Sequence, residues 1–510
     1  MSSVYLLVLL IIPLVGAVLV WLLPKDDEQV AKWVTLGTAL ATLAVAVAMS
    51  VSFDPNGPRF QLVFSRSWIP SFGVHFALGV DGIALVLIAL VAVLVPCVIA
   101  ASWHEETPAG KSAKTFFALL LLLEFFMIGV FAATDVFLFY VFFEAMLVPM
   151  YFLIGAFGGP RRQYAAVKFF LYSLVGGLLM LAAVIGLYVV SGRSLGHGTF
   201  AFTELAGMHI EPGTEKLLFL GFFIAFAIKA PLVPFHTWLP DAGAEAPAGG
   251  AALLVGVLDK VGTFGFLRYC LPLFPNASRY FAPAVIVLSV AGVIYAALLA
   301  MGQRDMKRLI AYTSVAHFGF IGLGIFAFTS QGMAGAVFYM VNHGLATGAL
   351  FLAAGILISR GKSREISDYG GVAKTQPLLG GAFLLAGLAS LALPGMSTFV
   401  SEFLVLVGTF TRHRTYAVIA TSGIILAALY ILILYQRVFH GPPKEDARGW
   451  RDLNAREIWA VGPLLALIVV LGIYPKPVLD IIRPAVNATM TDVHQTDPVP
   501  TVAAQTGENK

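Results

Sequence analysis

Apolar residues occur in long runs that recur along almost the whole chain of 510 residues. A helix of about 20 apolar residues crosses the roughly 30 Å hydrocarbon core of a membrane. Fourteen runs approach or exceed this length: 4–23, 33–52, 79–103, 115–133, 135–157, 165–191, 216–238, 247–270, 281–302, 308–328, 332–358, 377–410, 415–440 and 457–482. The pattern predicts an all-α polytopic membrane protein with about 14 transmembrane helices.

Composition supports this interpretation and removes several classes of protein. Hydrophobic residues make up 59% of the chain and charged residues 12%, whereas soluble domains are about half apolar and a quarter charged. Cys97 and Cys270 lie in different apolar runs, so no thiolate-held zinc or iron–sulfur spacing exists. The small net charge of +4 does not imply nucleic acid. A soluble enzyme and a disordered protein are both excluded.

The 32 Lys and Arg residues predict how the chain is oriented. If the N-terminus faces outward, nineteen fall in cytoplasmic loops, Lys25 among them, and eleven fall on the other side, including Arg268 and Lys510. Because basic residues collect in cytoplasmic loops, both termini are predicted on the outer face. The first run lacks a basic leader and is expected to be a retained helix. The polar stretch 487–510 is expected to be a disordered tail.

Three glutamates and two lysines stand well inside long apolar stretches, namely Glu124, Glu144, Lys229, Lys260 and Glu402. A charge at the centre of a membrane costs roughly 2.5 to 3.5 kcal/mol, so such residues usually face a bundle interior and mark a pathway. A buried Glu–Lys pair can stay charged or neutralise by passing one proton, which a proton pump requires. Snorkelling lysines and pairs that only hold helices together are the alternatives.

Several histidines and one aspartate add to the titratable residues in apolar runs. His317 and His343 lie in apolar runs beside small and polar residues, and histidine can relay protons near neutrality. Packing residues or a haem clamp are the alternatives. His236 either belongs to the relay or marks a helix end. Asp259 adjoins Lys260, but consecutive helical side chains point about 100° apart, so we do not expect it to face the lysine.

Two of the predicted helices contain breaks. Pro231 and Pro234 follow Lys229, whereas Pro394 and Gly395 precede Glu402. Interrupted helices at matching places in two halves indicate an inverted repeat with an ion path at mid-membrane. The predicted divisions are helices 1–3 over 1–110, a first five-helix repeat over 111–275, a second inverted repeat over 276–440, helix 14 over 441–486, and the tail over 487–510.

Several long sequence segments around the buried charges resemble those of a known protein family. FLFYVFFEAMLVPMYFLIGAFGG, AIKAPLVPFHTWLPDA, RDMKRLIAYTSVAHFGFIGLG and LPGMSTFVSEFLVLVGTF resemble the antiporter-like proton-translocating subunits of respiratory complex I, NADH:quinone oxidoreductase. The resemblance is strong from about 115 to 440. Glu402 stands where related subunits often have lysine, which favours the chain M (subunit 4) branch over chains L and N. PDAGAEAP departs from the usual PDAH, so Gly243 removes one candidate titratable group.

The resemblance implies a role in proton transfer for particular residues. It makes Glu144 and Lys229 an ion pair of the first half-channel, Lys260 the central lysine, His317 and His343 the connecting groups, Glu402 the acid at the exit and Glu124 a further buried acid. Separating or closing Glu144 and Lys229 would then drive a proton through Lys260 and the histidines to Glu402.

The resemblance also implies a setting. The partners would be other membrane-arm subunits, including neighbouring antiporter-like subunits, together with the lipid bilayer of a bacterial inner membrane and protons. No redox centre is expected in this chain. FMN, iron–sulfur clusters and quinone would belong to partner subunits. A subunit of a multisubunit cation/proton antiporter is the main alternative. A membrane cytochrome using His317 and His343 and a purely structural subunit are the others.

Overall fold

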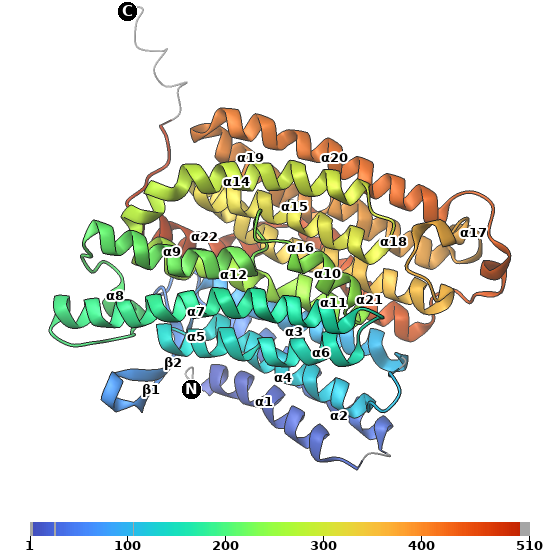
Figure 1. Cartoon of the computed structure of the whole chain (residues 1–510), viewed down its shortest axis with the longest axis horizontal. Coiled ribbons are helices and arrows are strands. Elements are labelled where there is room, and N and C mark those ends of the chain that lie inside the picture. Colours follow the sequence, from blue (N-terminus) through green and yellow to red (C-terminus); the bar gives the residue numbers. More distant parts are fainter. Residues whose placement is uncertain (1–3, 25–26, 106, 500–510) are drawn as a thin grey trace, which may run out of the picture.

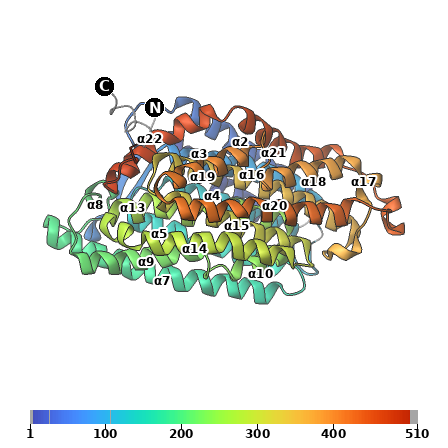
Figure 2. The same ribbon diagram turned by 90° about the horizontal axis from the view of Figure 1, so that it is seen from above.

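The computed structural model describes residues 4–24, 27–105 and 107–499. Lys25 and Lys510, which entered the prediction of orientation, lie outside the described residues. The helices lie side by side along the long axis of the molecule and form one bundle (Figure 1). Figure 2, turned by 90°, shows the same alignment, with α7 along one edge and α21 and α22 toward the other. The predicted all-α polytopic membrane fold is confirmed.

The N-terminal third contains long helices and one hairpin. Its helices are α1 (Val4–Leu22), α2 (Glu28–Ser52), α3 (Gly82–Ala101), η2 (Ser102–His104), α4 (Ala113–Ala132), α5 (Val136–Ala145), α6 (Leu147–Phe157) and α7 (Arg162–Leu195). Strands β1 (Gln61–Ile69) and β2 (Val74–Val80) pair antiparallel around η1 (Pro70–Phe72), a hairpin that the search for apolar runs did not predict. The third helix therefore begins at Gly82, where the Asp81 side chain accepts a hydrogen bond from Ala84 N.

The middle of the chain begins with a series of mostly short elements. They are α8 (Phe202–Leu205), α9 (Pro212–Lys229), α10 (Trp238–Glu245), α11 (Ala248–Leu253), η3 (Leu254–Leu258), α12 (Lys260–Gly265), η4 (Phe266–Cys270) and α13 (Leu271–Leu273). Long helices follow: α14 (Pro275–Met301), α15 (Met306–Phe326) and α16 (Ser330–Gly361). The C-terminal part contains η5 (Ile366–Asp368), α17 (Val372–Thr375), α18 (Pro377–Ser390), α19 (Ser397–Arg412), α20 (Arg414–Phe439), η6 (Glu445–Gly449), α21 (Ala455–Ile473) and α22 (Lys476–Asp492).

The two predicted breaks are present. α9 ends at Lys229 and α10 begins at Trp238, whereas α18 ends at Ser390 and α19 begins at Ser397. Proline lacks the N–H that continues a helix, so the prolines in both segments account for the interruptions. In the part of the chain that the structure describes, twelve helices are long and apolar enough to cross a membrane. The other two predicted runs, 216–238 and 377–410, contain the interrupted helices.

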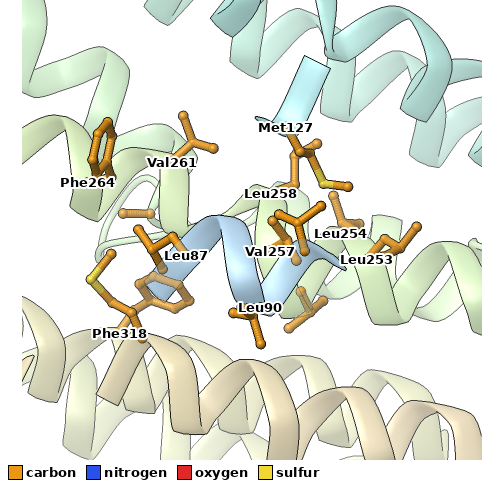
Figure 3. Close-up of a cluster of buried hydrophobic side chains, with 14 of the residues drawn as sticks. Leu87, Leu90, Met127, Leu253, Leu254, Val257, Leu258, Val261, Phe264 and Phe318 are labelled. Carbon is orange, nitrogen blue, oxygen red and sulfur yellow. The ribbon is translucent and has the colours of Figure 1, made fainter. Parts of the chain in front are cut away.

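The run 247–270 forms the centre of the bundle. Every residue of its most apolar stretch is buried. The run also includes two π-helical turns, η3 and η4. Figure 3 shows Leu254, Val257 and Leu258 packed among Leu87 of α3 and Met127 of α4, with Phe318 of α15 nearby. Arg268, counted above among the outer cations, is 2% exposed and its Nη2 lies 2.7 Å from Asp81 Oδ1. The sequence count missed this burial because the acidic partner, which immediately precedes α3, is far from Arg268 in the sequence.

The predicted disordered tail is wrong for its first residues. The fourteenth apolar run contains α21, and after a break at Tyr474 and Pro475 the chain continues as α22 to Asp492. α22 buries one face through Leu479, Ile482 and Val486, and Arg59 Nη1 lies 2.7 Å from Asp492 Oδ2. An amphipathic helix needs only this one apolar stripe. The predicted boundary at 486 therefore falls inside a helix.

The start of α1, the β-hairpin, α8 and the end of α22 lie at one end of the bundle, with α17 at the opposite end (Figures 1 and 2). The described parts nearest the two termini thus share one end. Which end faces the cytoplasm stays a prediction from the distribution of lysine and arginine.

Candidate functional site

Six of the titratable residues found in apolar runs are almost completely covered by protein. Their exposed fractions are 0% for Glu124, Lys229 and Lys260, 1% for His343, 2% for His317 and 4% for Glu402. Glu144 is half-buried. A snorkelling lysine keeps its ammonium group at a wet surface. The burial of Lys229 and Lys260 therefore excludes that alternative.

Lys260 lies at one end of a buried polar cluster that also contains His343, His317 and Glu402, and it has three partners. Its Nζ lies 2.6 Å from His343 Nδ1, and it donates to Val255 O at 2.5 Å and to Asp259 Oδ1 at 3.0 Å. A lysine ammonium group has three donors and no acceptor. Three acceptors therefore match a protonated Lys260, with His343 Nδ1 accepting.

The contact with Asp259 corrects the prediction that these neighbours do not face each other. That prediction considered only where the Cβ atoms point, whereas the flexible lysine stem brings Nζ back to the preceding carboxylate. The π-helical turn η3 also contributes, since Asp259 N bonds to Leu254 O, five residues earlier. Such turns disturb the regular helical pattern and occur often at functional sites. Val255 O is thereby available to the lysine.

The contacts of the cluster continue from His343 toward α15. His343 Nε2 lies 3.0 Å from Ser314 Oγ, and the His343 and His317 ring centroids are 5.2 Å apart. Both nitrogens of His343 already have partners, and the rings of His343 and His317 pack edge to face at 81°. A haem held between the two histidines would need a free nitrogen on each ring and a porphyrin between them. The predicted alternative of a haem clamp does not fit these residues.

Glu402 closes the other end of the cluster. Tyr339 OH donates to Glu402 Oε2 at 2.8 Å. One turn away, Asn342 Nδ2 donates to Ser397 O at 2.9 Å and lies 3.2 Å from Ser401 Oγ. These contacts join α16 to the first turns of α19, immediately after the break in the helix. The side chains at the break are thus held by polar contacts.

Small residues let α16 and α19 approach closely. A Cβ added at Gly335 would lie 2.7 Å from Leu404 Cβ and 3.0 Å from Ser401 O. A Cβ at Gly408 would lie 2.3 Å from Gly332 N. Larger side chains at these positions would push the helices apart and separate Glu402 from α16.

The first half of the predicted path is arranged differently. Lys229 Nζ lies 4.8 Å from the Phe143 ring centre and 5.8 Å from that of Phe169. It has no hydrogen-bond partner among the described residues. Glu144 and Lys229 interact electrostatically, but no hydrogen bond or ion pair joins them in the described chain. The ion pair implied by the resemblance is therefore open in this conformation.

Glu144 instead lies against α7. A Cβ added at Gly177 would lie 1.7 Å from Glu144 Oε1. Glycine at this position therefore provides the space that the carboxylate occupies. Among the described residues, no hydrogen bond links Lys229 to Lys260.

Two further candidates remain apart from the cluster. Both carboxylate oxygens of Glu124 and the Nδ1 atom of His236 lack a hydrogen-bond partner among the described residues. The His236 ring packs against Tyr295 with centroids 5.4 Å apart. The structure thus connects Lys260, His343, His317 and Glu402, and leaves Glu124 and His236 outside their contacts.

A separate charged cluster surrounds α10. Lys168 Nζ lies 2.6 Å and Arg308 Nη1 2.5 Å from the carboxylate of Asp241. Glu245 pairs with Arg364 at 3.1 Å. These acids belong to the PDAGAEAP segment, where a Cβ added at Gly243 would lie 3.2 Å from Ala311 Cβ. The helix packing at Gly243 is close, and the acids on either side are held by basic residues.

Sequence reasoning missed Tyr339, Tyr430, Ser314 and Asn342. A signal for some of them existed, because Tyr339 precedes His343 by four residues and Ser314 precedes His317 by three, which places each pair on one helical face. Within residues 4–24, 27–105 and 107–499, no group of three or more His, Cys, Asp or Glu side chains could hold a metal ion.

Residues 133–427 match the family described as NADH:quinone oxidoreductase/Mrp antiporter, TM. The chain is also 50% identical to NADH-quinone oxidoreductase subunit M of Mycobacterium tuberculosis, with 98% of this chain and 96% of the relative covered. The chain belongs to this family. The resemblance inferred from the sequence is confirmed, and the matched segment includes both Glu144 and Glu402.

Further relatives and solved structures are also similar to this chain. Subunit M of Rhodobacter capsulatus is 43% identical, covering 92% of each chain. A chain of respiratory complex I from Thermus thermophilus superposes with a TM-score of 0.87 at 32% identity, covering 97% of this chain and 100% of that chain. A chain of the Mrp complex from Dietzia has a TM-score of 0.84 at 23% identity, covering 96% and 99%, and shows the shared fold.

Proposed function

We propose that this chain is the M-type proton-translocating subunit in the membrane arm of an NADH:quinone oxidoreductase. Its similarity to subunit M over almost the full length supports this assignment. The observation that carries the mechanism is the polar contact that joins Lys260 to His343 across the bundle. Quinone reduction elsewhere in the complex would supply the energy.

His343 has the geometry of a relay. Its Nδ1 faces Lys260 and its Nε2 faces Ser314, so a proton taken up on one nitrogen leaves from the other. Lys260 is the donor in this step, His317 lies next along the path, and Glu402 is the terminal acceptor.

Glu144 and Lys229 would control the first step. Closing or opening their ion pair changes the electrostatic potential at Lys260, since unit charges interact strongly in a low-dielectric interior. In scale, moving one charge across 100 mV requires about 2.3 kcal/mol. The open pair in this structure represents one of the two states that such a switch needs.

The wider setting follows from the assignment. The partners are other complex I subunits, including neighbouring antiporter-like subunits. FMN, the iron–sulfur clusters and the quinone site would belong to partner subunits of the complex. The membrane is a bacterial inner membrane with both termini outside. The excess of lysine and arginine in the predicted cytoplasmic loops supports this orientation.

A cation/proton antiporter subunit is the second candidate, because the family description covers Mrp antiporters and the Dietzia chain shares the fold. Purification of the tagged native complex separates the two. Flavin and iron–sulfur absorbance with NADH:quinone activity supports complex I. Small membrane partners with sodium-dependent transport would contradict it.

The proton path is tested with the whole complex in sealed vesicles. We expect Lys260→Ala and Glu402→Gln to abolish NADH-driven acidification while NADH still reduces ferricyanide through the peripheral part. Lys476→Ala, at a side chain that is 70% exposed, should pump normally. Undiminished acidification in both buried variants would exclude this path.

A further inference from the structure

His317 and Glu402 have no hydrogen bond to each other, although the proposed path must connect them. Two tyrosines from different helices lie beside them: one contacts both residues and the other contacts His317. Tyr339 belongs to α16 and Tyr430 to α20. Both are almost completely buried, at 0% and 2% exposed.

Tyr339 contacts both neighbours. Its ring centroid lies 5.8 Å from that of His317, and its hydroxyl donates to Glu402 Oε2 at 2.8 Å. Hydrogen bonds to a charged acceptor are stronger than neutral ones. No described group is hydrogen-bonded to Glu402 Oε1. The contact therefore fixes one carboxylate oxygen and leaves the other to accept a proton.

Tyr430 contacts the histidine. Its hydroxyl oxygen lies 3.5 Å from His317 Nε2. The two tyrosines and Glu402 also interact electrostatically. A hydroxyl group can both donate and accept, so it can face either protonation state of the imidazole.

The rings themselves have a packing role that is separate from their hydroxyl groups. Tyr339 stacks on Phe320 with ring centroids 6.3 Å apart and planes 12° apart. A phenylalanine at either position keeps the ring and removes one oxygen. Substitution by phenylalanine therefore separates the hydroxyl group from the packing.

We propose that Tyr339 and Tyr430 are positioning residues for the last proton transfer, with Tyr430 orienting His317 Nε2 and Tyr339 orienting the Glu402 carboxylate. In that step the N–H bond of the histidinium breaks and an O–H bond forms at Glu402, and both tyrosines keep their protons. This inference rests on the proposed function of Glu402 as the terminal acceptor.

The test uses Tyr339→Phe, Tyr430→Phe and the double variant in the intact complex in vesicles. We expect each single variant to lower the proton-pumping rate about tenfold, a factor equal to about 1.4 kcal/mol of barrier. The double variant should lower it further. NADH:ferricyanide activity and complex assembly should stay at the wild-type level. Tyr269→Phe is the matched control, since Tyr269 is also buried but donates to Ala133 O.

Infrared difference spectroscopy supplies a readout that a change in side-chain packing alone would not alter. The carboxyl band that disappears in Glu402→Gln should shift in Tyr339→Phe, because the hydrogen bond to Oε2 is lost, and should stay in place in Tyr269→Phe.

Three outcomes are distinguishable. Normal pumping in Glu402→Gln would overturn the proposed function itself. Loss of pumping in Glu402→Gln with normal pumping in both tyrosine variants would overturn only this inference. An unshifted carboxyl band in Tyr339→Phe would also contradict it.

Discussion

Lys260 Nζ and His343 Nδ1 lie 2.6 Å apart although 83 positions separate the two residues in the chain. The contact joins α12, in the first predicted repeat, to α16, in the second. It is therefore the point at which a proton could pass from one half of the chain to the other, and the substitutions below start from it.

Removing the His343 side chain should interrupt the path. In His343→Ala, Lys260 loses one of its three acceptors and the relay loses its only group between Lys260 and Ser314. Positioned acid–base groups typically contribute about 10²- to 10⁴-fold to a rate, so we expect at least a 100-fold loss of NADH-driven pumping. His413→Ala, between α19 and α20, should retain it. Equal pumping in the two variants would contradict the assignment.

Gly177→Ala should act through Glu144. The new Cβ would lie 1.7 Å from the present position of Oε1, so the carboxylate must move away from α7. Displacement of about 1 Å from a reactive geometry can cost about 100-fold, and we expect pumping to fall by about 10- to 100-fold. Alanine favours a helix over glycine, so α7 itself should not weaken. Gly37→Ala, where no atom lies within 4 Å of the new Cβ, is the control.

Arg268→Ala should destabilise the protein. Arg268 and Asp81 are both buried, with their charges 2.7 Å apart, and removing one partner of a buried ion pair costs about 3 to 5 kcal/mol. Thermal unfolding of the detergent-purified complex should show a lower Tm. Because the double variant Arg268→Met/Asp81→Asn leaves no unpaired charge and keeps a side-chain oxygen that can accept from Ala84 N, it should recover most of the loss. A double variant no more stable than Arg268→Ala would argue against the pair.

Glu211 should give a pH-dependent contribution outside the membrane spans. Its carboxylate accepts hydrogen bonds from the N–H groups of Gly213 and Thr214, which lower its pKa below the usual 4.5. A lowered pKa in the folded state stabilises the protein above the unfolded value, and this stabilisation is lost as the pH falls through the folded value. The Tm difference between wild type and Glu211→Ala should therefore shrink on acidification below about pH 4.5. A constant difference would show that the charge is not involved.

The charged part of the site could be predicted because burying a charge is costly. Lys229, Lys260 and Glu402 each interrupt a long apolar run, and each is buried in the structure. The prolines likewise predicted both broken helices. These signals are local and therefore visible in one sequence.

Contacts between distant helices could not be predicted in the same way. Tyr430 lies 113 positions from His317, and nothing in its own run distinguishes it from a packing residue. The partnership of Asp259 with Lys260 depended on a flexible side chain and a π-helical turn. The amphipathic helix α22 was missed because a search for uniformly apolar segments passes over a helix with one polar face.

One further consequence concerns α16, which runs from Ser330 to Gly361 without a break. His343 and Tyr339 stand one turn apart on this helix, so one contacts Lys260 while the other contacts Glu402. A tilt or translation of α16 would change the contact of His343 with Lys260 and the contact of Tyr339 with Glu402 at the same time. Because both side chains belong to one continuous helix, a single rigid-body movement of α16 would couple the two contacts mechanically.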